Sequence, residues 1–462
     1  MSSKDNSEWY LGVVRDAVRD AVHNTVVEKG SVSKNELCGA TSPNASKSHA
    51  LDILSELPVE LSLKILSYLT VFELCQSVSY VCSRWYSLSR DLNLWHALDI
   101  STRDRQHIGV EQLLGIKHML TRLRSLDVTE RDDVVNIKGL IELCSSLSSL
   151  KRFNLGFCCN LNRPCLKVIS LYCTDLEHLN LEGCKNVGPR SLAPLASLCL
   201  KSLSLSHCDW LEESDIVDLL EHQTTLEALD IDGIPCTSLS ACRKVADLAK
   251  TLTRLRVDGI SMEDGCLEYV SHCVNLTEFR ISFCELLTDV GLDHLQSLDR
   301  LSSLCLKKGF LFSAGGLVGL FEAWKLGDPA RMVYLNLTEC SLVDDSTVTA
   351  IAAIFINLQE LHLAWCWEVT DTGLLSIVRS LRDLRHLDLC GLRKIVGVPL
   401  KDIPFNQKQL VMLDCTQCHV VNDSILRDVA CTMPQLKVIN YYNNRMDNFS
   451  QHNCTLGTSD VE

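Results

Sequence analysis

The sequence has no excess of basic residues and no long uncharged apolar run. Its 44 Lys and Arg are outnumbered by 58 Asp and Glu, which gives a formal net charge of −14 over 462 residues. General nucleic-acid binding requires a basic footprint, and a membrane-spanning helix requires about 18 or more apolar residues. The longest apolar candidate, residues 348–365, is interrupted by Asn357, Gln359, Glu360 and His362. We therefore expect no nucleic-acid partner and no membrane partner.

The first ten residues also lack the apolar core of a secretory signal. We therefore expect a cytoplasmic and/or nuclear protein whose 24 cysteines are reduced thiols and form no disulfide framework. Free Cys behaves as a small buried hydrophobe with a weak donor, which favours a structural role. One group of cysteines recurs three residues after the last apolar position of a repeated phrase: Cys158, Cys184, Cys208, Cys284, Cys340, Cys366 and Cys418.

The repeated phrase is L-x-x-L-x-L. It begins at Leu123, Leu150, Leu176, Leu200, Leu226, Leu252, Leu276, Leu301, Met332, Leu358, Leu384, Leu410 and Leu436. The spacing is 24–27 residues, except for 31 residues between Leu301 and Met332. A fixed period is typical of a solenoid, in which each unit buries its apolar face against its neighbours. We predict an α/β leucine-rich-repeat solenoid of about 13 repeats over residues 98–442, with a curved parallel sheet inside and helices outside, followed by a polar tail at 443–462.

Each phrase predicts a short strand followed by a turn and a helix. Because side chains alternate across a strand, apolar positions 4 and 6 point into the core and positions 3, 5 and 7 line the concave face. Thr288 and Thr370 each precede an Asp at an expected helix start, where a Thr side chain accepts hydrogen bonds from the first turn. Residues 95–100 predict a half-strand that caps the first repeat. The 31-residue interval contains an insertion, which either overhangs the concave face or lengthens the convex helix.

Residues 51–97 do not contain the phrase and instead show helical spacing of apolar residues, which predicts three short helices. So small a unit has little apolar area of its own, so its exposed Leu, Ile and Trp indicate a partner surface. Residues 1–50 form an N-terminal extension, with a short helix expected near 9–28 and a flexible linker after it.

The order of motifs in residues 51–97 is informative. Leu57-Pro58-Val59-Glu60 is followed by Ile65-Leu66-Ser67-Tyr68-Leu69, then by Val81-Cys82-Ser83-Arg84-Trp85 and by Asn93-Leu94-Trp95. This segment resembles an F-box. Together with the Cys-containing repeats, residues 51–442 resemble the F-box/leucine-rich-repeat family of ubiquitin-ligase substrate receptors. The resemblance implies a non-catalytic subunit that binds a Skp-family adaptor and, through it, a cullin and a RING protein. The adaptor-binding residues that it implies are Leu57, Pro58, Ile65, Leu66, Leu69 and Trp85.

Target-binding candidates come from the concave positions of the repeats. A basic group, Arg254, Arg256, Arg280 and Lys307, falls on adjacent predicted strands and is suited to acidic or phosphorylated groups. The alternative is that these side chains, mixed with Asp258 and Glu278, simply solvate the sheet. A second group is Tyr334, His362, Trp365 and Tyr442, since exposed aromatics often anchor partners; the alternative is that the tryptophans pack over the rim.

No catalytic residues are predicted, because no nucleophile, base and orienting acid fall near one site. Cys415 and Cys418 imitate a metal motif, but both occupy positions of the repeat, so no metal or cofactor is expected. Three functions remain open: a ubiquitin-ligase substrate receptor for an unknown protein target, a non-degradative scaffold, and a small-molecule-dependent receptor of the same architecture.

Overall fold

The computed structural model describes residues 57–69, 71–101, 113, 116–234 and 238–446. The chain divides into two compact units, residues 1–186 and 187–462. The predicted N-terminal extension and the polar tail beyond residue 446 lie outside the described residues.

The first unit begins with three short helices. They are α3 (Val59–Leu66), α4 (Val71–Gln76) and α5 (Ser83–Ser89), with the 3-10 turns η2 (Val78–Tyr80) and η3 (Leu92–Leu94). Their apolar faces meet in one core that includes Leu66, Leu74 and Trp85. Pro58 precedes α3, where its missing N–H costs no helical hydrogen bond. The indole of Trp95 donates to the Ser89 carbonyl at 3.0 Å and ties the end of the helical segment to α5.

Four parallel strands of the first unit follow in chain order. They are β1 (Ala97–Asp99), β2 (Ser125–Asp127), β3 (Arg152–Asn154) and β4 (His178–Asn180), with η4 (Lys117–Arg122), α7 (Ile137–Cys144) and α8 (Arg163–Tyr172) between them. The segment predicted as a half-strand cap is β1, which pairs with β2 over all three residues. Buried Arg131 secures it by donating from Nη1 to the Ile100 carbonyl at 2.7 Å.

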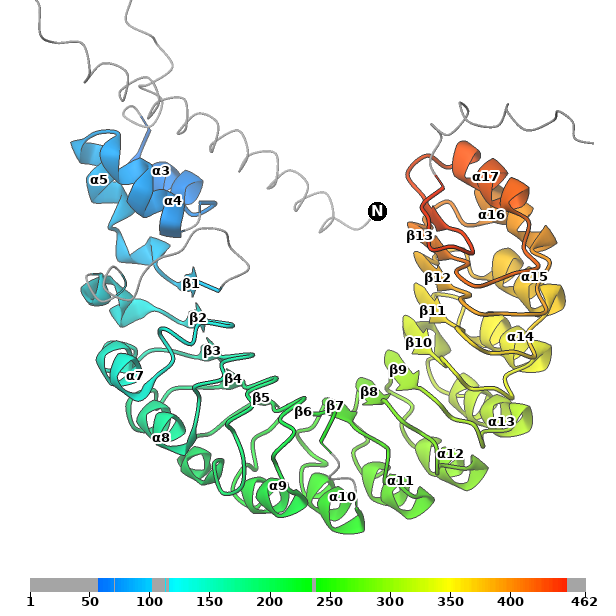
Figure 1. The fold of residues 1–462 in the computed structure, drawn as a ribbon, viewed down its shortest axis with the longest axis horizontal. Coiled ribbons are helices and arrows are strands. Elements are labelled where there is room, and N and C mark those ends of the chain that lie inside the picture. Colours follow the sequence, from blue (N-terminus) through cyan, green and yellow to red (C-terminus); the bar gives the residue numbers. More distant parts are fainter. Residues whose placement is uncertain (1–56, 70, 102–112, 114–115, 235–237, 447–462) are drawn as a thin grey trace, which may run out of the picture. The chain divides into compact units, whose positions relative to one another are not determined.

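The second unit contains ten strands, also in chain order (Figure 1). They are β5 (Ser202–Ser204), β6 (Ala228–Ile231), β7 (Arg254–Val257), β8 (Glu278–Ile281), β9 (Ser303–Leu306), β10 (Tyr334–Asn336), β11 (Glu360–His362), β12 (His386–Asp388), β13 (Met412–Asp414) and β14 (Lys437–Ile439). Each strand is parallel to its neighbours in the unit. The predicted leucine-rich-repeat fold is confirmed: the fourteen described strands are the predicted cap β1 and one strand for each of the thirteen phrases.

Helices of the second unit lie along the outer side of its strands (Figure 1). The helices are α9 (Glu213–Leu220), α10 (Leu239–Ala246), α11 (Asp264–Val270), α12 (Asp289–Leu295), α13 (Ala314–Lys325), α14 (Asp345–Ile354), α15 (Asp371–Ser380), α16 (Ile403–Asn406) and α17 (Asp423–Thr432), with 3-10 turns η5 (Ala193–Ser197), η6 (Pro329–Arg331) and η7 (Val398–Asp402). The long interval produces α13, which has 12 residues, and η6 after it. The insertion therefore lengthens the convex side, where buried Trp324 donates to the Leu295 carbonyl at 3.3 Å.

The recurring cysteines connect successive repeats. In five of the seven repeats that carry this cysteine, Sγ donates to the carbonyl at the last apolar position of the preceding repeat, as from Cys340 to Leu306 at 3.1 Å and from Cys418 to Leu389 at 2.9 Å. Cys284 instead donates to the Ile281 carbonyl of its own repeat at 3.9 Å. These cysteines are reduced and buried, and burial raises the pKa of Cys340 to about 12. The residue before the cysteine takes a left-handed conformation in several repeats, including Trp365 at φ 62°. This turn directs the next side chain into the core.

Helix starts connect the repeats on the convex side. Thr288 and Thr370 cap α12 and α15 as predicted. Each also donates its hydroxyl to an aspartate of the preceding helix: Thr288 to Asp264 at 2.6 Å and Thr370 to Asp345 at 2.5 Å. The repeats are therefore joined by buried thiols near the strands and by carboxylates at the helix ends.

The end of the second unit is covered by its own chain. After β14 the backbone turns back, and the Met446 N–H donates to the Val438 carbonyl at 2.9 Å. Arg445 forms an antiparallel bridge with Ile439. An exposed strand edge promotes pairing with other chains, so this turn protects β14, and the chain beyond residue 442 begins with ordered contacts.

Candidate functional site: the F-box surface and the strand-lined face

The helical segment of the first unit exposes apolar side chains on α3. Val59 is 49% exposed and Leu61 is 53% exposed, and Pro58 beside them is also exposed. Leu57 and Ile65 are half-buried and pack against the core below. Exposed aliphatic groups on a unit with so small a core mark a surface suited to a partner.

Three of the residues that the resemblance implies as adaptor-binding are buried in the described structure. Leu66 has no exposed surface, and Leu69 and Trp85 are each 7% exposed. They belong to the helical core, so their side chains support the unit and are not available for direct contact with a partner. The motif spacing identified these positions correctly as apolar, but only packing separates core from surface.

Val59 and Leu61 were not among the predicted contact residues. Both lie in the first turn of α3, and their exposure is visible only once the core is formed. Tyr86 on α5 is a further exposed side chain, with the Arg90 guanidinium stacked 4.3 Å from its ring centroid. Helical spacing gave no signal that separates these exposed residues from the core residues of the same helix.

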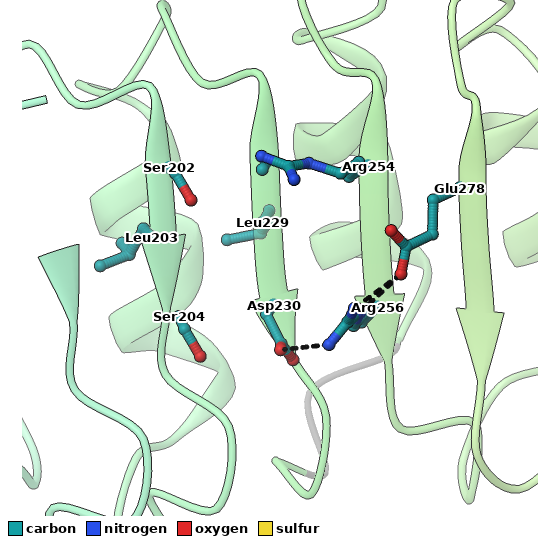
Figure 2. A pocket seen from close by; sticks show the side chains of 9 residues that line it. Ser202, Leu203, Ser204, Leu229, Asp230, Arg254, Arg256 and Glu278 are labelled. Carbon is teal, nitrogen blue, oxygen red and sulfur yellow. Dashed lines mark hydrogen bonds and ion pairs between the residues drawn. The ribbon is translucent and has the colours of Figure 1, made fainter. Parts of the chain in front are cut away.

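In the second unit, a cavity of about 180 Å³ opens on the face lined by strands (Figure 2). Ser202 and Ser204 come from β5, Asp230 from β6, and Arg254 and Arg256 from β7. Glu278 on β8 is the last polar residue of the lining. The cavity lies over four neighbouring strands, β5 to β8, and its lining contains hydroxyl groups together with acidic and basic side chains.

The arginines of the cavity differ in their partners. Arg256 donates from Nε to Glu278 at 2.8 Å, and its Nη1 lies 3.6 Å from Asp230 Oδ2 (Figure 2). Arg280 Nε also lies 2.7 Å from Glu278 Oε1. Burial lowers the pKa of Arg256, but the hydrogen bond and charge of Glu278 outweigh it and raise that pKa. Arg256 and Arg280 therefore share the Glu278 carboxylate, one of the two acidic residues that the sequence places among these cations.

Arg254 is the cation that remains available in this cavity. Its side chain is exposed and makes no hydrogen bond or ion pair with the part of the chain that the structure describes. It reaches from β7 across β6, on the same side as Ser202 (Figure 2). The fourth predicted cation, Lys307, is half-buried just after β9. Of the two arginines that line the cavity, Arg254 therefore has the guanidinium that no carboxylate of the described residues holds.

A row of polar and aromatic contacts continues from Arg280 along the same face. The Arg280 guanidinium lies 4.5 Å from the centroid of the Tyr334 ring, and that ring is 5.4 Å from the His362 ring. His362 Nδ1 lies 3.2 Å from Asp388 Oδ2. Burial raises the pKa of Tyr334. The structure therefore brings Arg256, Arg280, Tyr334 and His362 into one continuous row.

The other two aromatic candidates lie outside this row. Tyr442 is 73% exposed after β14 and contacts Tyr441 edge to face. Trp365 lies at the exit of β11, where it packs over Gly391: a Cβ at Gly391 would come within 2.6 Å of the indole. Trp365 also lines a separate cavity at the strand exits.

The remaining motif of chemical interest has a structural role. Cys418 donates to the preceding repeat, and the hydrogen bond with Cys418 and burial raise the pKa of Cys415. Across residues 57–446, where described, no group of three or more His, Cys, Asp or Glu could hold a metal ion. Among the helices that can be described, none combines the length and apolarity needed to cross a bilayer.

Short parallel strands backed by helices define the second unit as part of a leucine-rich-repeat protein. A leucine-rich-repeat family model matches residues 272–299 and 356–378. An F-box-like model matches residues 54–101, which include α3 to α5. The chain therefore combines an F-box-like segment with leucine-rich repeats, and the resemblance recognised from the motifs is confirmed.

Curated relatives share this combination in their names. The chain is 26% identical over 251 residues to F-box/LRR-repeat protein 4 of Bos taurus, covering 50% of this chain and 38% of the bovine protein. It is 24% identical over 258 residues to putative F-box/LRR-repeat protein 9 of Arabidopsis thaliana, covering 54% of this chain and 95% of the plant protein. The match thus spans well under half the length of the bovine relative.

Among solved structures, one chain in the crystal structure of the yeast Rad7–Elc1 complex is similar in fold. The TM-score is 0.58 at 15% identity, with 95% of each chain covered. At this identity the likeness concerns the fold alone.

Proposed function

We propose that the chain is the substrate-recognition subunit of a Skp–cullin–F-box ubiquitin ligase that acts in the cytoplasm and/or nucleus. Its F-box binds a Skp-family adaptor, which brings a cullin and a RING protein. Its strand-lined face binds a target protein for ubiquitination and degradation. The chain itself catalyses nothing: it holds a target lysine near the charged enzyme and so raises their effective concentration.

The observation that carries the proposal is the F-box-like match combined with the exposed apolar surface of α3. Val59 and Leu61 are exposed and do not belong to the buried core. They can therefore contact another protein while the core residues keep the segment folded. In the yeast Rad7–Elc1 crystal structure, a chain of similar fold belongs to a complex, which supports a role within an assembly.

On the strand-lined face, the geometry favours an acidic or phosphorylated segment of the target. Arg254 lacks a partner among the described residues, and Ser202 and Ser204 add hydroxyl donors beside it. A guanidinium forms short, strong bonds with carboxylate and phosphate. At about 180 Å³ the cavity is smaller than the roughly 300–1,000 Å³ of most small-molecule sites, so it is better suited to a side chain than to a hormone-sized ligand.

The adaptor surface is tested by Val59→Glu combined with Leu61→Glu. A charge on each side chain opposes burial against an apolar partner, so we expect loss of adaptor and cullin from the purified complex. Leu326→Glu is the matched control, because Leu326 is 91% exposed at the end of α13. Retention of the adaptor by the double variant would refute the docking surface.

The target surface is tested by Arg254→Glu. We expect it to reduce capture and ubiquitination of target proteins and to leave adaptor binding intact. Arg427→Glu on α17 is the control, since it reverses an exposed charge outside the cavity. Salt should weaken wild-type capture, because exposed pairs are screened within about 8–10 Å. A degradative role further requires target abundance to rise when the chain is depleted; unchanged abundance would favour the scaffold alternative.

A further inference from the structure

A second cavity lies at the strand exits of the second unit, away from the cavity of Figure 2. It has a volume of about 280 Å³ and is lined by Phe310, Glu339, Ser341, Trp365 and Trp367. Phe310 is 39% exposed and Trp367 is 40% exposed. Aromatic side chains of two repeats, with Glu339 and Ser341 of the repeat between them, therefore surround a space that is open to solvent.

The only charged side chain of this lining is Glu339. It is half-buried, and its carboxylate makes no hydrogen bond or ion pair with any residue that the structure describes. A partly desolvated carboxylate is stabilised by a cation. Arg393 stacks on Trp367, with its guanidinium carbon 5.1 Å from the ring centroid, but it does not line the cavity. The carboxylate thus faces an aromatic space without a cation of its own.

Glu339 and Trp365 of this lining have left-handed backbone conformations. Glu339 has φ 63° and Trp365 has φ 62°, a left-handed region that is costly for residues with a side chain. Trp365 is fixed by close packing over Gly391. Both residues occupy the position before the recurring cysteine, so the left-handed turn of the repeat directs Glu339 and Trp365 to the same cavity at the strand exits.

We propose that this cavity, defined by Phe310, Glu339, Trp365 and Trp367, binds a methylated lysine side chain of a partner protein. The faces of aromatic rings attract cations, and aromatic cages suit methylated ammonium groups. An unmodified lysine ammonium is a compact, strongly hydrated charge, so it loses more hydration on entering an aromatic space with a single carboxylate. Methyl groups reduce that loss and contact the rings.

This inference rests on the proposed capture of a target protein and adds a second contact to it. The two cavities call for opposite charges: an acidic or phosphorylated group at Arg254 and a methylated cation at Glu339. A target that carries both would be held at two places, and its affinity would depend on its methylation.

The test measures direct binding to the purified full chain by saturation-transfer NMR, without adaptor or target. The probes are N-acetyl-trimethyllysine amide, the unmethylated lysine compound, and the uncharged analogue with a tert-butyl group in place of the trimethylammonium. We expect the trimethyllysine compound to bind at least about tenfold more tightly than the uncharged analogue, and more tightly than unmethylated lysine. Equal or weaker binding of the methylated probe, or no binding of any probe, overturns the proposal.

Variants connect the binding to the cavity. Trp367→Ala and Glu339→Gln should each remove the preference for the methylated probe, while thermal melts remain close to wild type. Trp210→Ala changes a tryptophan that is 68% exposed outside the cavity, and Glu368→Gln changes an exposed carboxylate that is paired with Lys394. Both controls should keep the preference, and its survival in the cavity variants would overturn the proposal. Because no adaptor or target is present, this result is independent of the ubiquitin-ligase role.

Discussion

Replacement of Gly373 by alanine should weaken the link between α14 and α15, although alanine is the better helix former. The Asp345 carboxylate accepts from the Thr370 N–H at 2.8 Å, the Thr370 hydroxyl at 2.5 Å and the Gly373 N–H at 3.0 Å. A Cβ at Gly373 would lie 2.6 Å from Asp345 Oδ1 and 3.3 Å from Val348 Cβ. The carboxylate must therefore move away from the donors of the next repeat.

The magnitude follows from the bonds that are lost. Hydrogen bonds to a charged group contribute about 1.5–3 kcal/mol each, so displacement from two donors costs about 3–6 kcal/mol. The higher helix propensity of alanine returns up to about 1 kcal/mol. A net loss of about 2–6 kcal/mol is expected, which corresponds to a decrease in Tm of roughly 5–20 °C for a unit of this size.

Gly319→Ala in α13 is the matched control. Gly319 is also helical but, unlike the buried Gly373, it is exposed, and nothing lies within 4 Å of an added Cβ. Without a contact to disturb, alanine should raise the free energy of unfolding by about 0.5–1 kcal/mol. The two substitutions are identical in chemistry, and their effects should have opposite signs.

The assay is differential scanning calorimetry of both variants beside wild type, with Asp345→Asn as a third variant. Asp345→Asn removes the charge from the same bonds and should be destabilising. If Gly373→Ala raises the Tm as Gly319→Ala does, the contact with Asp345 does not hold the repeats together and the reasoning is refuted.

Three other outcomes are expected. Glu278→Gln should lower the Tm by a few degrees, because the Glu278 carboxylate pairs with two arginines, and this difference should shrink in high salt. Calorimetry at two salt concentrations measures it, and a Tm equal to that of wild type would show that the ion pairs do not stabilise the fold. At pH 8, iodoacetamide should modify the exposed Cys431 and leave Cys340 unmodified. Because the pKa of Cys340 is raised to about 12 in the folded chain and the unfolded thiol ionises near about 8.5, the free energy of unfolding is intact below about pH 8.5 and falls by about 2 kcal/mol per such thiol by pH 10. A free energy of unfolding that stays constant between pH 8 and pH 10 would contradict this. Trp85→Ala should lower the free energy of unfolding of the helical segment by about 3–5 kcal/mol, which is more than so small a unit has. Hydrogen exchange should therefore show loss of protection in residues 59–94, with residues 254–439 unchanged. Protection retained in both segments would show that Trp85 is not needed for the core.

The chain length between phrases and the order of apolar positions determined the repeat fold by themselves. A parallel strand of three or four residues must place alternate side chains on opposite faces, so the period alone predicted that Leu229 and Leu255 are buried and that Arg254 and Arg256 share a face. The cysteine position followed from the same regularity. The F-box motifs identified the helical segment, because they depend on local spacing.

Only the tertiary structure decided which of these side chains are available for binding. Glu278 is opposite Arg254 in register, yet its carboxylate accepts a hydrogen bond from Arg256 and lies beside Arg280. Long side chains reach several neighbouring positions, so the register of the strands does not determine which groups pair. Burial likewise separated Trp85 from Leu61, although both belong to one motif region. The aromatic cavity at Glu339 combines loop residues of three repeats. The left-handed turns at Glu339 and Trp365 recur with the repeat, but only the packing of the three loops shows that these side chains surround a cavity.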